Sequence, residues 1–114
     1  MVKLTNEMKA MLEKQLAIVA TANRTGLPNV GPKGSMYVID DETLAYSEGT
    51  LRKTYKNIVE NPKVSVMVVE REKLDGYQFR GTAEILGIGQ FFDAVAKRQE
   101  LRARPRPKKV IKIK

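Results

Sequence analysis

The feature that most constrains the fold is a series of short β-rich runs separated by turn residues. The clearest runs are 16–23, 43–47, 64–69 and 77–86. β-branched and alternating apolar residues at this spacing are typical of strands. No stretch of 18 apolar residues interrupts the series, so we expect no membrane-spanning helix. Short strands in mixed order with helices predict an α+β domain with a closed or nearly closed antiparallel barrel.

The remaining segments complete a plan of six strands and two or three helices. Asn6 or Thr5 can cap a first helix that runs to about residue 15. A strand over 28–39 is interrupted around Gly31–Gly34, because proline lacks a ladder N–H and glycine lets the backbone bend. Helical spacing covers 50–60 and 90–102, and an alternating run begins a final strand at 110. We expect one domain over 1–114, in which 105–114 is a basic tail leading into that last strand.

The chain contains no cysteine and no histidine. This composition excludes disulfides, thiolate nucleophiles, zinc held by cysteine or histidine, and a Ser-His-Asp triad. We therefore expect no catalytic side chain and no metal site, and any chemistry is most simply carried by a bound cofactor.

The net charge of +8 is concentrated at one end of the chain. Residues 1–96 hold twelve Lys/Arg and twelve Asp/Glu, whereas residues 97–114 hold nine Lys/Arg and one acid. A solvated basic tail and a surface for phosphate or nucleic acid are both compatible with this distribution. The N-terminus has the charged pattern of an amphipathic helix, with no apolar signal-peptide core, so we expect a cytoplasmic protein.

The most informative segment for chemistry is 46–62. A strand end and Gly49 lead into Arg52, Lys53 and Thr54, which we place in the first turn of a helix opening at about residue 50. Cations are disfavoured at the positive end of a helix dipole, so their presence there indicates a nearby anion. Free amides, a lysine and a hydroxyl suit a phosphate monoester. An exposed face that is basic by chance remains the alternative.

The order of these segments resembles the FMN-binding split-barrel family, which includes pyridoxamine-phosphate oxidase. The resemblance runs from about residue 8 to 86. It is carried by the strand at 16–21, the Gly-Leu-Pro-Asn-Val hairpin at 26–30, the Arg-Lys-Thr helix and the Phe-Arg-Gly-Thr-Ala-Glu strand at 79–84. It implies a six-stranded antiparallel split β-barrel (Greek key) with two or three peripheral helices. The chain is much shorter than a full oxidase of this type.

The resemblance also implies a cofactor and its contacts. FMN would lie beside the interface of a homodimer, with Lys53 and Thr54 on the phosphate and Arg52 assisting. Tyr46, Ser47, Glu48 and Gly49 would line the phosphate and ribityl region. Gly31, Pro32, Lys33 and Gly34 would run along the flavin ring. Lys33 could favour an anionic reduced flavin, or it could be an ordinary exposed lysine at a strand edge.

The resemblance thus predicts an FMN-binding flavoprotein, an oxidoreductase or electron carrier with a small-molecule or protein electron partner. One alternative is a nucleic-acid-binding small barrel with a basic C-terminal arm. That function requires exposed aromatic residues, and aromatics make up 6% of the chain. The other alternative is the same fold with a deazaflavin or haem, and the lack of histidine argues against haem.

Overall fold

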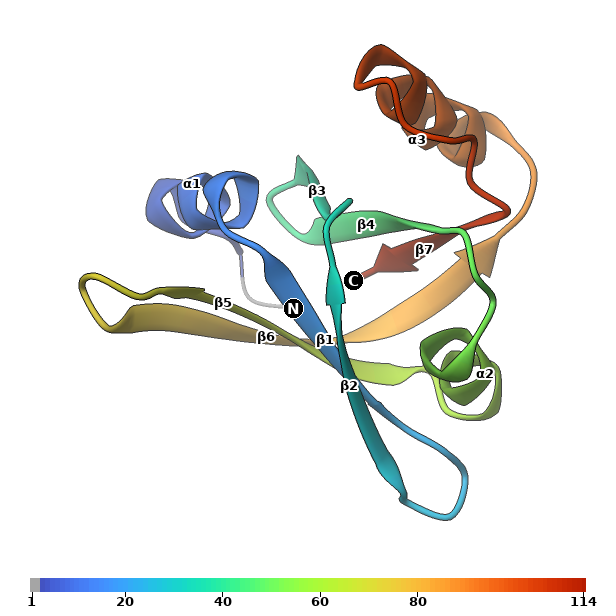
Figure 1. Ribbon diagram of the computed structural model, residues 1–114, viewed down its shortest axis with the longest axis horizontal. Helices are drawn as coiled ribbons and strands as arrows, with labels where there is room; N and C mark the ends of the chain where they lie inside the picture. Colours follow the sequence, from blue (N-terminus) through green and yellow to red (C-terminus); the bar gives the residue numbers. More distant parts are fainter. Residues whose placement is uncertain (1–2) are drawn as a thin grey trace.

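Ten elements follow one another along residues 3–114, the part of the chain that the computed structural model describes (Figure 1). The helices are α1 (Asn6–Lys14), α2 (Lys53–Glu60) and α3 (Gln90–Leu101). The strands are β1 (Ala17–Ala22), β2 (Pro28–Lys33), β3 (Tyr37–Asp40), β4 (Thr43–Glu48), β5 (Lys63–Glu70), β6 (Asp75–Leu86) and β7 (Lys109–Ile113). No helix within residues 3–114 is long and apolar enough to cross a membrane.

The first helix begins as its sequence predicts. Of the two candidate caps, Thr5 is the one used: its hydroxyl accepts a hydrogen bond from the amide of Met8, and the Met8 sulfur accepts one from the amide of Thr5. These bonds satisfy donors that the first helical turn leaves without intrahelical partners. The helix places Leu12 in the core.

The seven strands form one antiparallel sheet in the order β2-β1-β5-β6-β7-β4-β3. Strand β6 belongs to both halves, since its first part pairs with β5 and its last four residues pair with β7. The change of partner occurs between Thr82 and Ala83, just after Gly81. A Cβ on Gly81 would lie 2.8 Å from the carbonyl oxygen of Lys114 and 2.9 Å from a methyl of Ile113. Glycine lets the end of β7 approach β6 this closely.

The prediction of six strands is wrong by one, and the barrel is not closed. The interrupted strand at 28–39 is two separate strands, β2 and β3, joined by a turn at 34–36. These two strands are the opposite edges of the sheet, so the sheet curls until one short turn links its ends (Figure 1). Among residues 3–114 no ladder joins β2 to β3. Pro28 and Pro32 in β2 lack the N–H groups that a continuous edge ladder needs.

The C-terminal segment is only partly the tail that its charge suggests. Residues 102–106 and 108 are exposed, but β7 is a central strand between β6 and β4. Val110, Ile111 and Ile113 have no solvent exposure. The alternation of apolar and basic residues therefore marks a strand whose apolar side chains complete the core.

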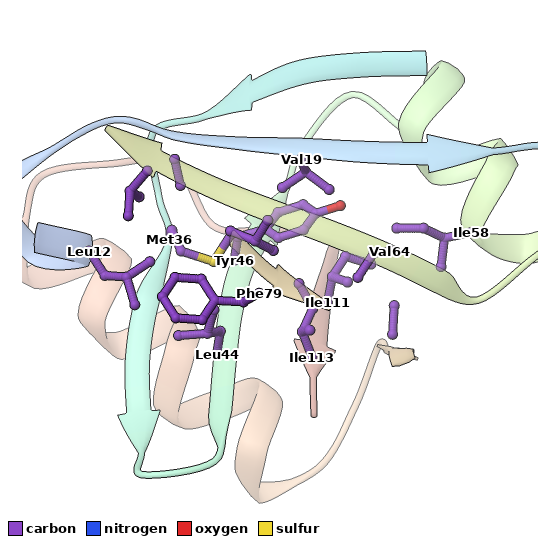
Figure 2. Packing of buried hydrophobic residues seen from close by; sticks show 14 of the residues in the cluster. Leu12, Val19, Met36, Leu44, Tyr46, Ile58, Val64, Phe79, Ile111 and Ile113 are labelled. Atoms are coloured by element: carbon purple, nitrogen blue, oxygen red, sulfur yellow. The ribbon is translucent and has the colours of Figure 1, made fainter. Parts of the chain in front are cut away.

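The main core lies between the two halves of the sheet. Figure 2 shows Leu12, Met36, Leu44 and Phe79 meeting residues of β1, β5 and β7 around Tyr46. A second cluster lies under α3, where Phe92, Val95 and Ala96 pack on β3, β4 and β7. There the buried hydroxyl of Tyr37 donates a hydrogen bond to the side-chain oxygen of Gln99.

Candidate functional site

The loop between β4 and α2 is organised by a buried carboxylate. Glu48 ends β4 with 2% of its surface exposed, and its Oε2 accepts hydrogen bonds from the amides of Thr50 and Leu51, both at 3.0 Å. The Thr50 hydroxyl donates a third at 3.2 Å. Leu51 has φ of 53°, a left-handed conformation that is uncommon outside glycine. The Glu48 side chain therefore occupies amides at 50 and 51 that could otherwise bind an external anion.

Helix α2 begins at Lys53, three residues later than the pattern predicts. Arg52 is its N-cap rather than a member of its first turn, and no side chain caps the helix amides. The first turn contains no acidic residue, and both Arg52 and Lys53 are exposed. Within residues 3–114, neither cation is paired with a carboxylate. Two free cations beside uncapped amides at the positive end of a helix form a suitable place for an anion.

Thr54 is largely covered by β2. It is 7% exposed, and its hydroxyl oxygen accepts a hydrogen bond of 3.1 Å from the Asn29 side-chain amide. A Cβ on Gly31 would lie 3.8 Å from the same oxygen. Because Thr54 accepts from Asn29, its hydroxyl proton remains available for donation. Sequence reasoning missed Asn29, although the alternation along β2 places Asn29, Gly31 and Lys33 on one face.

Lys33 turns inward from β2 toward the end of β4. Its Nζ lies 3.6 Å from Glu48 Oε1 and 5.3 Å from the centre of the Tyr46 ring, and its side chain is 18% exposed. Lys33 is therefore not an exposed strand-edge lysine. Tyr46 is fully buried, and its hydroxyl and Glu48 Oε1 both lack a hydrogen-bond partner within the described residues. Burial raises the pKa of the Tyr46 hydroxyl well above 10.0, and the Glu48 charge raises it further.

The turn at 34–36 is held by two contacts that the sequence did not indicate. The Ser35 hydroxyl donates to the Ser47 carbonyl at 3.3 Å and accepts from the Ser47 amide at 3.0 Å. An Arg104 Nη donates to the carbonyl oxygen of Gly34 at 3.0 Å. Arg104 is 70 residues away in sequence and bonds to a backbone group, so no local pattern identifies this contact.

The structure thus brings most of the predicted site residues together. Gly31 faces the start of α2, Lys33 meets Tyr46 and Glu48, and Ser47 holds the turn that contains Gly34. Pro32, Gly34 and Gly49 are exposed, and Pro32 points away from this group.

Two open hollows lie elsewhere on the sheet. One of about 600 Å³ is bordered by β1, β5 and β6, and one of about 700 Å³ lies at the turn between β5 and β6.

Residues 3–114 contain no cluster of three metal-binding side chains.

Comparison with known proteins agrees with this architecture. Residues 4–114 match the family model described as pyridoxamine 5'-phosphate oxidase. The crystal structure of HupZ from Group A Streptococcus shares 44% identity and a TM-score of 0.92, over 96% of this chain and 87% of that chain. A candidate pyridoxamine 5'-phosphate oxidase from Lactobacillus delbrueckii has 28% identity and a TM-score of 0.83, over 99% and 90% of the two chains.

An uncharacterised protein of Methanocaldococcus jannaschii is 36% identical over 117 residues, which span 98% of this chain and 78% of the relative. More distant structures share the fold alone at 22% and 23% identity. They include an FMN-binding protein from Syntrophomonas wolfei and an F420 reductase. The match over nearly the whole chain, on a curled antiparallel sheet with the same elements, shows that the chain belongs to the pyridoxamine 5'-phosphate oxidase family.

Proposed function

We propose that this protein binds FMN and uses it as an oxidoreductase or electron carrier. The observation that carries the proposal is the start of α2, where exposed Arg52 and Lys53 flank uncapped helix amides and have no carboxylate partner within residues 3–114. A phosphate dianion would satisfy both the cations and the amides. Membership of a family with an FMN-binding solved relative supports the choice of flavin.

Each group at the proposed site has a separate task. Lys53 and the first amides of α2 hold the phosphate, Arg52 adds charge, and the Thr54 hydroxyl donates a hydrogen bond while Asn29 fixes its orientation. The backbone of Gly31–Gly34 orients the ring. When bound, the flavin supplies the redox chemistry by taking up and releasing electrons. The protein residues bind and orient it, and none of them needs to react.

A second copy of the chain is the partner we propose for the exposed face of the β2-β1-β5 part of the sheet. Val30, Met67 and Val69 lie on that face with 67%, 46% and 43% of their surfaces exposed. The hollow of about 700 Å³ beside Met67 and Val69 belongs to the same surface. Uncovered apolar area of this kind is typical of a protein interface. A homodimer would cover it, and β2 would then carry the interface on one face and the proposed flavin site on the other.

Two features weigh against a nucleic-acid function. Part of the basic C-terminal segment is the central strand β7, not a free arm. The aromatic rings nearest its arginines are buried: Arg102 lies 4.8 Å from the ring of Tyr37, and Arg106 lies 5.2 Å from that of Phe92. Such rings cannot stack on bases.

The phosphate assignment is tested by titrating FMN and riboflavin and following flavin fluorescence. Lys53→Ala should weaken FMN binding by roughly tenfold or more, because a charge-assisted hydrogen bond contributes about 1.5–3 kcal/mol. Riboflavin, which lacks the phosphate, should change less than about threefold. Lys56→Ala removes an exposed lysine one residue past the first turn and is the matched control. Equal losses for both flavins would contradict the assignment. Oxidised F420, which is fluorescent, distinguishes the deazaflavin alternative in the same titration.

A further inference from the structure

Glu48 is a buried carboxylate that organises the loop leading into the proposed phosphate site. Its Oε2 holds the amides of Thr50 and Leu51, and these residues lead straight into Arg52 and Lys53. Its Oε1 accepts no hydrogen bond within the described residues. A buried carboxylate is costly unless a charge or several hydrogen bonds compensate it. A second anion bound next to this loop would also be repelled by it.

Lys33 supplies the compensating charge. Its Nζ lies 3.6 Å from Oε1, and among residues 3–114 no other cation pairs with Glu48. Lys33 comes from β2 and meets Oε1, whereas the loop amides bond to Oε2, and the same Nζ lies 5.3 Å from the centre of the Tyr46 ring. The pair is therefore built from two strands, and it is mostly buried, with 18% of the Lys33 side chain and 2% of the Glu48 side chain exposed.

We propose that Lys33 is a charge-compensating positioning residue for the flavin site. It allows Glu48 to shape the loop at 49–51 without repelling the phosphate, and so sets the preference for FMN over unphosphorylated riboflavin. This inference rests on the proposed function. It differs from a direct action of Lys33 on the flavin ring, because here Lys33 acts only through Glu48.

The expected effect follows from Coulomb's law. At an effective dielectric constant of about 20, an uncompensated unit charge acting over about 10 Å lowers the affinity for a single negative charge roughly fifteenfold, and the affinity for a dianion by more. Lys33→Met keeps the length of the stem and removes the charge, so it should weaken FMN binding by roughly that factor. Glu48→Gln keeps an oxygen for the loop amides and removes the charge that Lys33 compensates.

The experiment is a double-mutant cycle with Lys33→Met, Glu48→Gln and the double variant, each titrated with FMN and with riboflavin. Lys33→Met should lower FMN affinity at least tenfold and riboflavin affinity less than about threefold. The double variant should return FMN affinity to within about threefold of the wild-type value. A double variant as weak as Lys33→Met would overturn the proposal, because Lys33 would then contact the flavin itself. Equal losses for the two flavins would also overturn it.

Lys33→Met leaves the buried Glu48 carboxylate without its cationic partner, so this variant could fail to fold. In that case Glu48→Gln alone decides: it leaves the Lys33 charge uncompensated, so FMN affinity should rise about tenfold while riboflavin affinity changes less than about threefold, and an unchanged or lowered FMN affinity would overturn the proposal.

The pairing can be measured without any ligand. Urea midpoints of the four apo-proteins should show a lowered midpoint for Lys33→Met that Glu48→Gln largely restores, whereas independent shifts would refute the pairing. If the wild type binds neither flavin, the proposed function fails. The urea midpoints would still test whether Lys33 and Glu48 stabilise each other in the apo-protein.

Discussion

Replacing Ile111 by alanine should destabilise the protein by about 3 to 4 kcal/mol. Ile111 lies in the central strand β7, pairs with Tyr46 in β4 and Ile85 in β6, and has no solvent exposure. The substitution removes three buried carbons, which at roughly 0.8 kcal/mol each corresponds to about 2.4 kcal/mol of transfer free energy. The cavity that remains between two strands adds about 1 kcal/mol.

Urea unfolding followed by far-ultraviolet circular dichroism measures this free energy, since the chain has no tryptophan for fluorescence. Lys108→Ala is the control from the same basic segment. Its side chain is exposed, and its only described bond, from its amide to the Glu48 carbonyl, survives the substitution. It should cost less than about 0.5 kcal/mol. A loss below about 1 kcal/mol for Ile111→Ala, similar to that of the control, would mean that this segment is a solvated tail.

Three further results are expected. Gly81→Ala should cost about 1–3 kcal/mol, because its Cβ would lie 2.8 Å from the carbonyl oxygen of Lys114. In the same urea assay Gly49→Ala should be nearly neutral, because its Cβ would meet nothing within 4 Å. Met67→Lys combined with Val69→Lys should convert the proposed dimer into a monomer in analytical ultracentrifugation, and a dimer with an unchanged sedimentation coefficient would place the interface elsewhere. The pKa of Asp40 is held below its ordinary 3.8, first by a hydrogen bond from the amide two residues on. The ionised Asp40 carboxylate therefore stabilises the folded protein above pH 3.8, and this contribution is lost as the pH falls through the folded-state pKa. Asp40→Asn should lower the melting temperature at pH 6 and have no such effect near pH 2.

Local patterns in the sequence identify most elements of this fold but not their neighbours. The alternation in β6 and the run in β5 correctly mark strands, because each strand has one face in the core. The pattern at 110–114 also marks a strand, yet nothing in it reveals a central position. Its partners lie in β4 and at the end of β6, and strand pairing over such separations depends on the complete core rather than on nearby residues.

In the candidate site, too, the sequence predicts the local features but not the contacts between distant segments. The positions of Arg52 and Lys53 at the start of a helix follow from the glycine turn before them and the helical spacing after them. The hydrogen bonds from the loop amides to Glu48 could be inferred from a local pattern, a carboxylate followed by Gly-Thr. The contacts of Thr54 with Asn29 and of Lys33 with Glu48 cross between distant strands. They depend on how the sheet curls, which residue spacing does not specify.

The central position of the last strand has a consequence for how the protein is made. On the ribosome, β4 and β6 emerge before β7, so these two strands cannot be bridged until residues 109–113 have left the exit tunnel. The half of the sheet formed by β1, β2, β5 and the start of β6 is complete before then. For that interval the nascent chain carries an unpaired β4 edge and exposed core residues, so this is the stage at which it is most prone to aggregate and to benefit from a chaperone.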